Sequence, residues 1–133
     1  MKLTPNDIEC IHAARNMIMQ DLHHQTIQQI AEASMLSPTK LKKGFKMIFG
    51  TGLFEYFEMA RLQKSKEMMT DPNKSLKQIS RAIGYKHPNN FSKAFKKKYG
   101  ITPRSWRKTL HTVLLISGQI IRLFVKLAGF TTI

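Results

Sequence analysis

Cysteine is almost absent from this chain of 133 residues. Cys10 is the only one, which excludes an intramolecular disulfide framework. No basic segment followed by an apolar stretch opens the chain, so we do not expect a secretory signal peptide. Both observations favour a reducing, cytoplasmic compartment.

Acidic side chains are also scarce: 8 Asp and Glu oppose 22 Lys and Arg, and the net charge is +14. The few acids are scattered, and neither a glycine-rich phosphate loop nor a nucleophile–base spacing is recognisable. Cys10 and His12 are separated from His23 and His24, and no second cysteine completes a tetrahedral set. We therefore expect no enzyme, no cofactor and no metal site.

The positive charge is concentrated in the middle of the chain. Residues 40–108 hold 18 Lys and Arg against 4 acids, whereas residues 1–39 sum to −2 and residues 109–133 to +2. A basic field confined to one region indicates a polyanionic partner there. The alternative is a soluble, lysine-rich face without a partner.

A pattern repeats in this basic region at a spacing of 49 to 50 residues. Each copy begins with a short segment containing Ile30 or Ile79, continues through a turn, and ends in a segment with an apolar residue at every fourth position. Those positions are Leu41, Phe45 and Phe49, then Phe91, Phe95 and Tyr99. Such spacing places the apolar side chains on one helix face. Two copies are too few for a solenoid, so we predict two helix-turn-helix units.

The remaining segments also predict helices, which makes the fold class all-α. A first helix over 7–22 has apolar residues at helical spacing: Ile8, Ile11, Ala14, Ile18 and Leu22. A longer helix over 53–70 joins the repeats and places Phe54, Phe57, Leu62, Ser65, Met68 and Met69 on one side, with Arg61 among them. Pro103 starts a last, short helix containing Trp106. Helix starts are expected after Thr26, Ser37 and Ser75.

The outward positions of the second helix of each unit are candidates for DNA contact, because that helix enters the major groove. Base-contact candidates are Thr39, Lys42, Lys43, Asn89, Asn90 and Lys93. Lysine suits guanine, asparagine suits adenine, and threonine suits a thymine methyl group or a base edge. Phosphate-contact candidates are Ser37, Lys40, Lys46, Lys86, His87, Lys96 and Lys97. The alternatives are a simple helix start at Asn89 and Asn90, and solvated lysines.

Three segments resemble the DNA-binding domain of AraC/XylS-type transcription regulators, across about residues 11–108. They are Leu-Ser-Pro-x-x-Leu-x-x-x-Phe-Lys from Leu36, Arg-Leu-x-x-Ser-Lys from Arg61, and the long run from Ile83-Gly-Tyr through Phe91-Ser-x-x-Phe-Lys to Gly100-x-Thr-Pro-x-x-Trp-Arg. The resemblance implies about seven helices, with two recognition helices in successive major grooves on one face of double-stranded DNA. It also implies a bacterial regulator, usually an activator, that contacts RNA polymerase. It places base contacts at the same six positions.

Two residues depart from the pattern of that family. Met35 occupies the place where the family usually has glycine, so the first turn is expected to be less tight than the second. Trp106 replaces the usual tyrosine. Members of the family usually attach this part to an N-terminal ligand-sensing domain, and we expect the chain to be the C-terminal DNA-binding part of a longer regulator.

The expected domain covers residues 1–108, with subdomain 1 over 7–52, the linker helix over 53–70 and subdomain 2 over 75–108. Residues 109–133 form an apolar tail without any acid, either an extra helix or disordered. The tail could pack on the domain, form a dimer or membrane-surface helix, or be peculiar to this chain. Packing or self-association is favoured, because so much apolar surface should not stay in water. Arg122 and Lys126 make an integral membrane span a poor candidate.

Two classes of function follow from these observations. The first is sequence-specific regulation of transcription through double-stranded DNA. The alternative is a nonspecific nucleic-acid-binding or membrane-surface-binding protein, driven by the basic field and the apolar tail. Base contacts discriminate among sequences by about 1–3 kcal/mol per recognised pair, whereas lysine–phosphate contacts alone ignore sequence.

Overall fold

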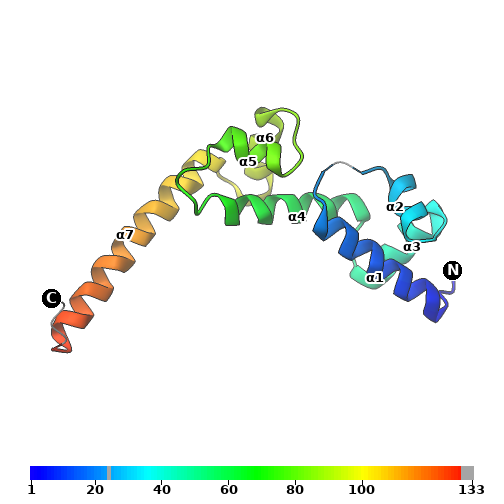
Figure 1. The fold of residues 1–133 in the computed structure, drawn as a ribbon, viewed down its shortest axis with the longest axis horizontal. Coiled ribbons are helices and arrows are strands. Elements are labelled where there is room, and N and C mark those ends of the chain that lie inside the picture. Colours follow the sequence, from blue (N-terminus) through cyan, green and yellow to red (C-terminus); the bar gives the residue numbers. More distant parts are fainter. Residues whose placement is uncertain (24, 130–133) are drawn as a thin grey trace.

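The computed structural model describes residues 1–23 and 25–129, and every regular element within those ranges is a helix. In chain order they are α1 (Pro5–Gln20), α2 (Ile27–Ala33), α3 (Pro38–Phe49), α4 (Leu53–Met68), α5 (Leu76–Ala82), α6 (Pro88–Tyr99) and α7 (Pro103–Leu127). The predicted all-α class with about seven helices is confirmed. In Figure 1, α4 lies between a group formed by α1, α2 and α3 and a second group formed by α5 and α6.

The helices α2, α3 and α5 begin where the sequence predicts, because hydroxyl side chains cap them, whereas α1 begins at Pro5, before the predicted start at residue 7. Thr26 and Ser75 accept a hydrogen bond from the backbone N–H three residues on, and the glutamine there bonds back to the cap. Ser37 also accepts a hydrogen bond, from the backbone N–H of Lys40, without a reciprocal bond, and a proline follows at the first helical position. The loop before α6 is one residue longer than the loop before α3, as the shift of the repeat spacing predicts.

Two separate hydrophobic cores lie on either side of the middle of α4. The first contains Ile11, Ala14, Ile18, Ile30, Ala31, Leu41, Phe45, Leu53 and Phe57. The second contains Leu62, Met69, Ile79, Ile83, Phe91 and Phe95, with Trp106 packed against it. Because α4 contributes Phe57 to one core and Leu62 to the other, it ties the two helix-turn-helix units together.

Two residues of the apolar stripes that the sequence indicates are not buried. Ile8 on α1 is 39% exposed and Phe54 on α4 is 56% exposed. The residues just before them, Asp7 and Leu53, are buried, so the start of each helix is covered on one side and Ile8 and Phe54 lie on the uncovered side. Ala60, which the apolar spacing had not singled out, is buried instead.

The turn between α2 and α3 is as tight as its counterpart, contrary to the expectation from Met35. Met35 adopts a left-handed conformation with φ of 60°, and Gly84 at the equivalent place has φ of 91°. The backbone hydrogen bond that follows is the same in both turns, 2.9 Å from Leu36 N to Ala31 O and 3.0 Å from Tyr85 N to Ser80 O. The first turn therefore keeps its geometry, and Met35 adopts a conformation that glycine tolerates better.

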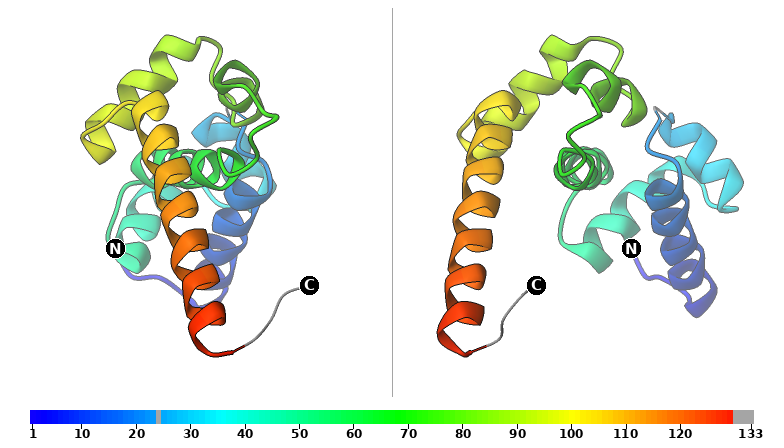
Figure 2. Two further views of the ribbon diagram at one scale, coloured as in Figure 1. Left: turned by 90° about the vertical axis from the view of Figure 1, so that its left-hand side faces the viewer. Right: turned by 60° about the vertical axis from the view of Figure 1, so that its left-hand side comes forward.

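The last helix is not short. α7 begins at Pro103, as predicted, and continues for 25 residues to Leu127, with Gly118 in its interior. Only its first part packs on the second core, and the rest projects away from the body (Figures 1 and 2). The predicted boundary at residue 108 therefore falls inside a continuous helix. Residues 130–133, the end of the predicted tail, lie outside the described residues.

Candidate nucleic-acid interface

The helices α3 and α6 have the same construction. Each contains 12 residues, starts with proline and ends before a glycine in the left-handed conformation, Gly50 or Gly100. On α3, Leu41 and Phe45 are fully buried, and on α6 the buried pair is Phe91 and Phe95. The opposite face of each helix is free to meet a partner.

The six predicted base-contact residues all lie on these free faces. Thr39, Lys42, Lys43, Asn89, Asn90 and Lys93 are exposed. They belong to the first half of α3 or of α6, the end of a recognition helix that contacts base edges. The structure therefore gives each helix a short polar or basic edge at its N-terminal end.

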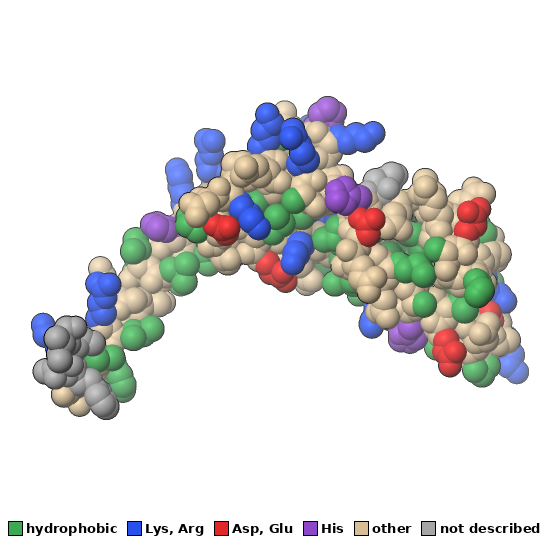
Figure 3. All heavy atoms as spheres, in the orientation of Figure 1, with side chains coloured by type: hydrophobic (Ala, Val, Ile, Leu, Met, Phe, Trp, Pro, Cys, Tyr) green, Lys and Arg blue, Asp and Glu red, His purple; other side chains and the backbone are tan. Residues whose placement is uncertain are grey.

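The predicted phosphate-contact residues surround these edges. Ser37, Lys46, Lys86, His87, Lys96 and Lys97 are exposed. Two of them also belong to the helix starts, because Ser37 is the N-cap of α3 and His87 precedes α6 as its N-cap. In Figure 3, Lys and Arg side chains gather over the part of the molecule formed by α5 and α6, whereas acidic side chains are few and separated.

Lys40 differs from the other candidates because it already has a partner. Its Nζ lies 3.2 Å from Oδ1 of Asp7, which is buried at the start of α1. Hydrogen bonds from the backbone and side chain of Thr4 lower the pKa of Asp7, and the hydrogen bond and charge of Lys40 lower it further against the opposing effect of burial. Lys40 thus holds α3 against α1, and its charge is partly neutralised.

Several other cations stack on aromatic rings in the two cores. The Nζ of Lys66 lies 3.6 Å from the centroid of Tyr99, and the guanidinium of Arg15 lies 5.2 Å from the centroid of Phe49. Arg107 donates to the backbone oxygens of Met69, Asp71 and Lys74, and so fixes α7 to the loop before α5. Part of the positive charge therefore stabilises the fold through partly buried side chains.

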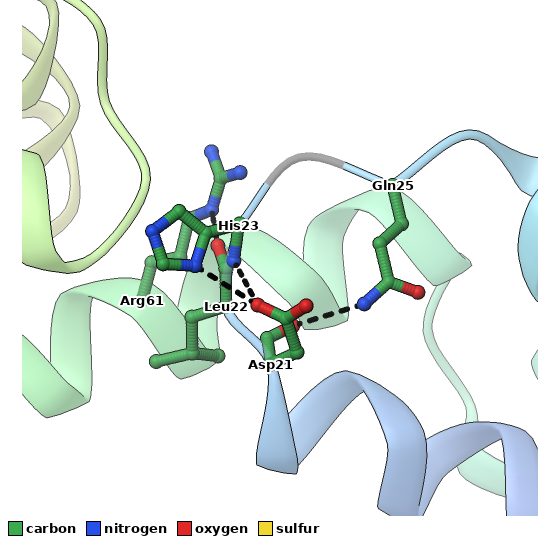
Figure 4. Close-up of polar contacts among 5 residues, drawn as sticks. All are labelled: Asp21, Leu22, His23, Gln25 and Arg61. Atoms are coloured by element: carbon green, nitrogen blue, oxygen red, sulfur yellow. Dashed lines mark hydrogen bonds and ion pairs between the residues drawn. The ribbon is translucent and has the colours of Figure 1, made fainter.

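Arg61 joins the two helix-turn-helix units, a role that its place in the apolar stripe of α4 did not reveal. It is 9% exposed, and its Nε donates to the backbone oxygen of Leu22 in the loop after α1, at 2.8 Å (Figure 4). The guanidinium also stacks 4.2 Å from the centroid of Phe57 and 5.2 Å from that of Tyr85. One side chain therefore contacts a loop of the first unit, the linker helix and the turn of the second unit.

The surroundings of Arg61 are tightly packed and partly unsatisfied. A Cβ atom added to Gly84 would lie 2.6 Å from the oxygen of Leu22 and 3.2 Å from Nη2 of Arg61. Among the described residues, that Nη2 has no hydrogen-bond partner. Burial lowers the pKa of Arg61, an effect that Tyr85 and Glu58 oppose, and burial raises the pKa of Tyr85. The junction between the two units, formed by Arg61 with Leu22, Tyr85 and Gly84, therefore depends on close contact.

Within the described ranges, no group of three or more His, Cys, Asp or Glu side chains could hold a metal ion. By length and composition, α7 could cross a membrane: its most apolar window has a mean hydropathy of 1.5, and none of that window is buried. The free faces of α3 and α6 are the candidate surface on which the sequence repeat and the geometry agree.

Comparison with known proteins agrees with this geometry. A family model described as a helix-turn-helix domain matches residues 30–109. The chain is 31% identical over 87 residues to the uncharacterized HTH-type transcriptional regulator YobQ of Bacillus subtilis strain 168, a match covering 65% of this chain and 36% of that protein. It is 27% identical over 111 residues to the xylose operon regulatory protein of Escherichia coli K12, covering 84% of this chain and 28% of that protein. The matched part thus spans about a third of these relatives.

Solved structures show the same fold. The C-terminal domain of AraT, a response regulator from Geobacillus stearothermophilus, superposes with a TM-score of 0.72 at 26% identity, covering 82% of this chain and 88% of that one. An AraC-type regulator from Chromobacterium violaceum gives a TM-score of 0.69 at 25% identity, covering 75% and 90%. The DNA-binding domain of AdpA in complex with a target DNA shares the fold alone, at 13% identity and a TM-score of 0.69 over 82% and 96%.

These matches are to DNA-binding transcription regulators and not to an enzyme family. The fold agrees with the family match, since it has two helix-turn-helix units, a shared linker helix and an exposed second helix in each unit. The chain therefore belongs to the AraC/XylS family and carries its helix-turn-helix DNA-binding domain.

Proposed function

We propose that the chain binds double-stranded DNA in a sequence-specific way, with α3 and α6 in successive major grooves, and thereby regulates transcription in the bacterial cytoplasm. The observation that carries this proposal is the pair of equivalent helices, each buried on one face and exposed at its N-terminal half. The proposed site is asymmetric, because Thr39, Lys42 and Lys43 differ in chemistry from Asn89, Asn90 and Lys93.

The two helices contribute differently in this proposal. α6 offers two asparagines, whose amides form bidentate hydrogen bonds with adenine, so it supplies most of the selectivity. α3 offers lysines and the small Thr39, so it supplies affinity and tolerates more sequences. Lys46, Lys86, Lys96 and Lys97 bind phosphates, together with Ser37 and His87 at the helix starts. Lys40 joins them only if it leaves Asp7.

The partner in regulation is RNA polymerase, and the expected effect is activation. This part of the proposal comes from the family, whose curated relatives here include the xylose operon regulatory protein of Escherichia coli. A transcription assay on a promoter carrying the selected site would test it. Increased transcript from purified polymerase supports activation, whereas reduced transcript indicates a repressor.

Selection of bound duplexes from a random DNA library, at near-physiological salt, tests the binding mode. We expect a two-part motif whose halves lie about ten base pairs apart, one helical turn. A single half-motif would mean that only one helix reads bases. Strong binding without any enriched sequence would leave the alternative function, a nonspecific nucleic-acid-binding protein whose affinity falls steeply with salt.

A further inference from the structure

The second half of α7 carries an apolar face that covers nothing in the described structure. Its side chains are exposed by 49% to 79%, and the whole apolar window is unburied. The exposed members of this α7 face are Val113, Leu114, Ile116, Ile120, Ile121, Leu123, Phe124 and Leu127. A contiguous apolar surface of this kind marks an interaction site.

The face lies outside the DNA-binding fold. The family model ends at residue 109, and the exposed face starts at Val113. In Figure 2, this part of α7 extends away from α3 and α6 as a single projecting rod. The DNA-binding units therefore do not need the face for their own packing, and a partner can reach it without covering the recognition helices.

The spacing of the side chains indicates that the partner is another helix. Leu110, Ser117 and Phe124 are seven residues apart, and so are Val113, Ile120 and Leu127, which lie three residues after them. This is the a and d spacing of a coiled coil, here over about two and a half heptads, with Ser117 as the one polar residue among the six positions. The flanking positions Leu114, Ile116, Ile121 and Leu123 widen the seam, as in helices that pack over a broad contact.

We propose that this face is a dimer interface, and that its occupant is α7 of a second copy of the chain. A symmetric pair uses the same patch on both subunits. A stable interface takes about 800 Å² from each partner, and eight large apolar side chains, each about half exposed or more, supply surface on that order. The basic residues do not oppose pairing, because Arg122 and Lys126 lie away from the seam positions.

The dimer would give the protein a second level of DNA recognition. Two DNA-binding domains joined through α7 are held near one another, so binding at one site raises the effective concentration at a neighbouring site. The chain is then expected to bind two adjacent copies of its site more tightly than either copy alone. This expectation goes beyond the proposed recognition of a single site by one domain.

Sedimentation velocity of the full chain over a wide concentration range tests the dimer. We expect the wild-type protein to shift from monomer to dimer with rising concentration. Ile120→Glu places a charge in the seam and should weaken dimerisation at least tenfold. The matched control Gln119→Glu adds the same charge one residue earlier on the polar face of α7, and it should leave the equilibrium within about twofold.

Three outcomes would overturn the proposal: a wild-type protein that stays monomeric throughout, equal effects of the two substitutions, or a monomer that instead floats with vesicles of anionic lipid. Affinity for one isolated DNA site, measured on all three proteins, separates this test from the proposed function. If the dimer is right, Ile120→Glu binds a single site like the wild type and loses only cooperative binding to a double site. If single-site binding is absent in every protein, the proposed DNA recognition is wrong, and the sedimentation result still decides whether the dimer forms.

Discussion

At the scale of single residues, Met35 occupies a backbone position that glycine would fit better. It adopts φ of 60° in the turn before α3, and its side chain is 81% exposed, so little packing compensates for the strained backbone. A left-handed conformation costs a non-glycine residue about 1–2 kcal/mol. We expect Met35→Gly to raise the free energy of unfolding by about 1 kcal/mol in urea titrations, since glycine lacks that penalty but is more flexible when unfolded.

Met35→Ala is the control for that prediction. It removes the same exposed side chain but keeps a Cβ atom, so the backbone penalty remains and stability should change little. If alanine stabilises as much as glycine, the exposed methionine side chain and not the backbone is the source of the effect.

Gly84, at the equivalent place in the second turn, is a position where glycine is required, because it lies against the junction between the two helix-turn-helix units. Its φ is 91°, and an added Cβ would lie 2.6 Å from the backbone oxygen of Leu22. Gly50 also has a positive φ, 74°, but an added Cβ there meets nothing within 4 Å. Gly50→Ala should cost about 1 kcal/mol from backbone strain alone, and Gly84→Ala roughly 3 kcal/mol, since the clash adds to the strain. Thermal or urea unfolding of both variants measures the difference, and equal losses would show that the junction yields easily.

Asp7 makes the stability depend on pH at the start of α1. Hydrogen bonds from Thr4, with a further contribution from Lys40, lower its pKa below the ordinary value of 3.8. The stabilisation is therefore fully present above that value and is lost as the pH falls through the lowered folded pKa. Compared with Asp7→Asn, the wild-type protein should lose its advantage below pH 3.8 and keep it at pH 6. Unfolding titrations at several pH values would contradict this if the difference did not change.

At the scale of elements, the proposed roles divide α6 into a base-reading start and a phosphate-binding basic end. Asn90 lies near the start of the helix and Lys97 about two turns further on, in its basic last turn, and both are exposed. We expect Asn90→Ala to relax preference at one or two base pairs in one half of the site, a loss of about 1–3 kcal/mol for the preferred base. Lys97→Ala should lower affinity for every sequence and reduce the salt slope by about one phosphate contact. Binding titrations on matched and mismatched duplexes at three salt concentrations compare them.

The alternative role of the α6 asparagines, that of starting the helix, predicts a different result for the same substitution. If Asn89 and Asn90 serve only to start the helix, Asn90→Ala reduces stability and not selectivity. If both substitutions weaken binding to all duplexes equally, the division between base-reading and phosphate-binding positions is wrong.

Helix starts were predictable from the sequence, because a capping side chain and its partner lie within three residues of each other. Thr26, Ser37 and Ser75 are the caps that the sequence indicates. The length of α7 was not predictable in this way, since the family pattern ends near residue 108 and nothing after it marks where the helix stops. Once the helix has started, leucine, isoleucine and lysine continue it at little cost, and one glycine takes away only about 1 kcal/mol.

The role of Arg61 was also hidden, for a different reason. Its neighbours Leu22 and Tyr85 lie far from it in sequence, and only the folded chain brings them together. An arginine within an apolar stripe signals burial with a partner, but periodicity cannot name that partner. By contrast, the free faces of α3 and α6 follow from local spacing. The exposed residues of the candidate interface could therefore be predicted one by one, but the placement of one helix relative to the other could not.

At the scale of the whole molecule, the two hydrophobic cores are joined by α4 and by the junction at Arg61. Phe57 and Leu62 anchor the same helix in different cores, and the guanidinium of Arg61 lies between them against Leu22 and Tyr85. A link this narrow determines whether the two units unfold together. The proposed binding mode, with α3 and α6 in successive major grooves, needs the two units to keep a fixed relative placement.

Arg61→Met tests that link, since methionine keeps much of the apolar stem but loses the hydrogen bond to Leu22 and the cation over the two rings. We expect unfolding of the wild-type protein in one cooperative step, and unfolding of the variant in two resolvable steps, because each core keeps its own packing. Affinity for the two-part DNA site should fall about tenfold or more, while binding to DNA carrying one half of the site should change little. Lys64→Met, which removes an exposed cation one turn along α4, controls for the loss of charge. A variant that still unfolds in one step and binds the full site normally would show that α4 alone fixes the two units relative to each other. Arg61 would then not be needed to link them.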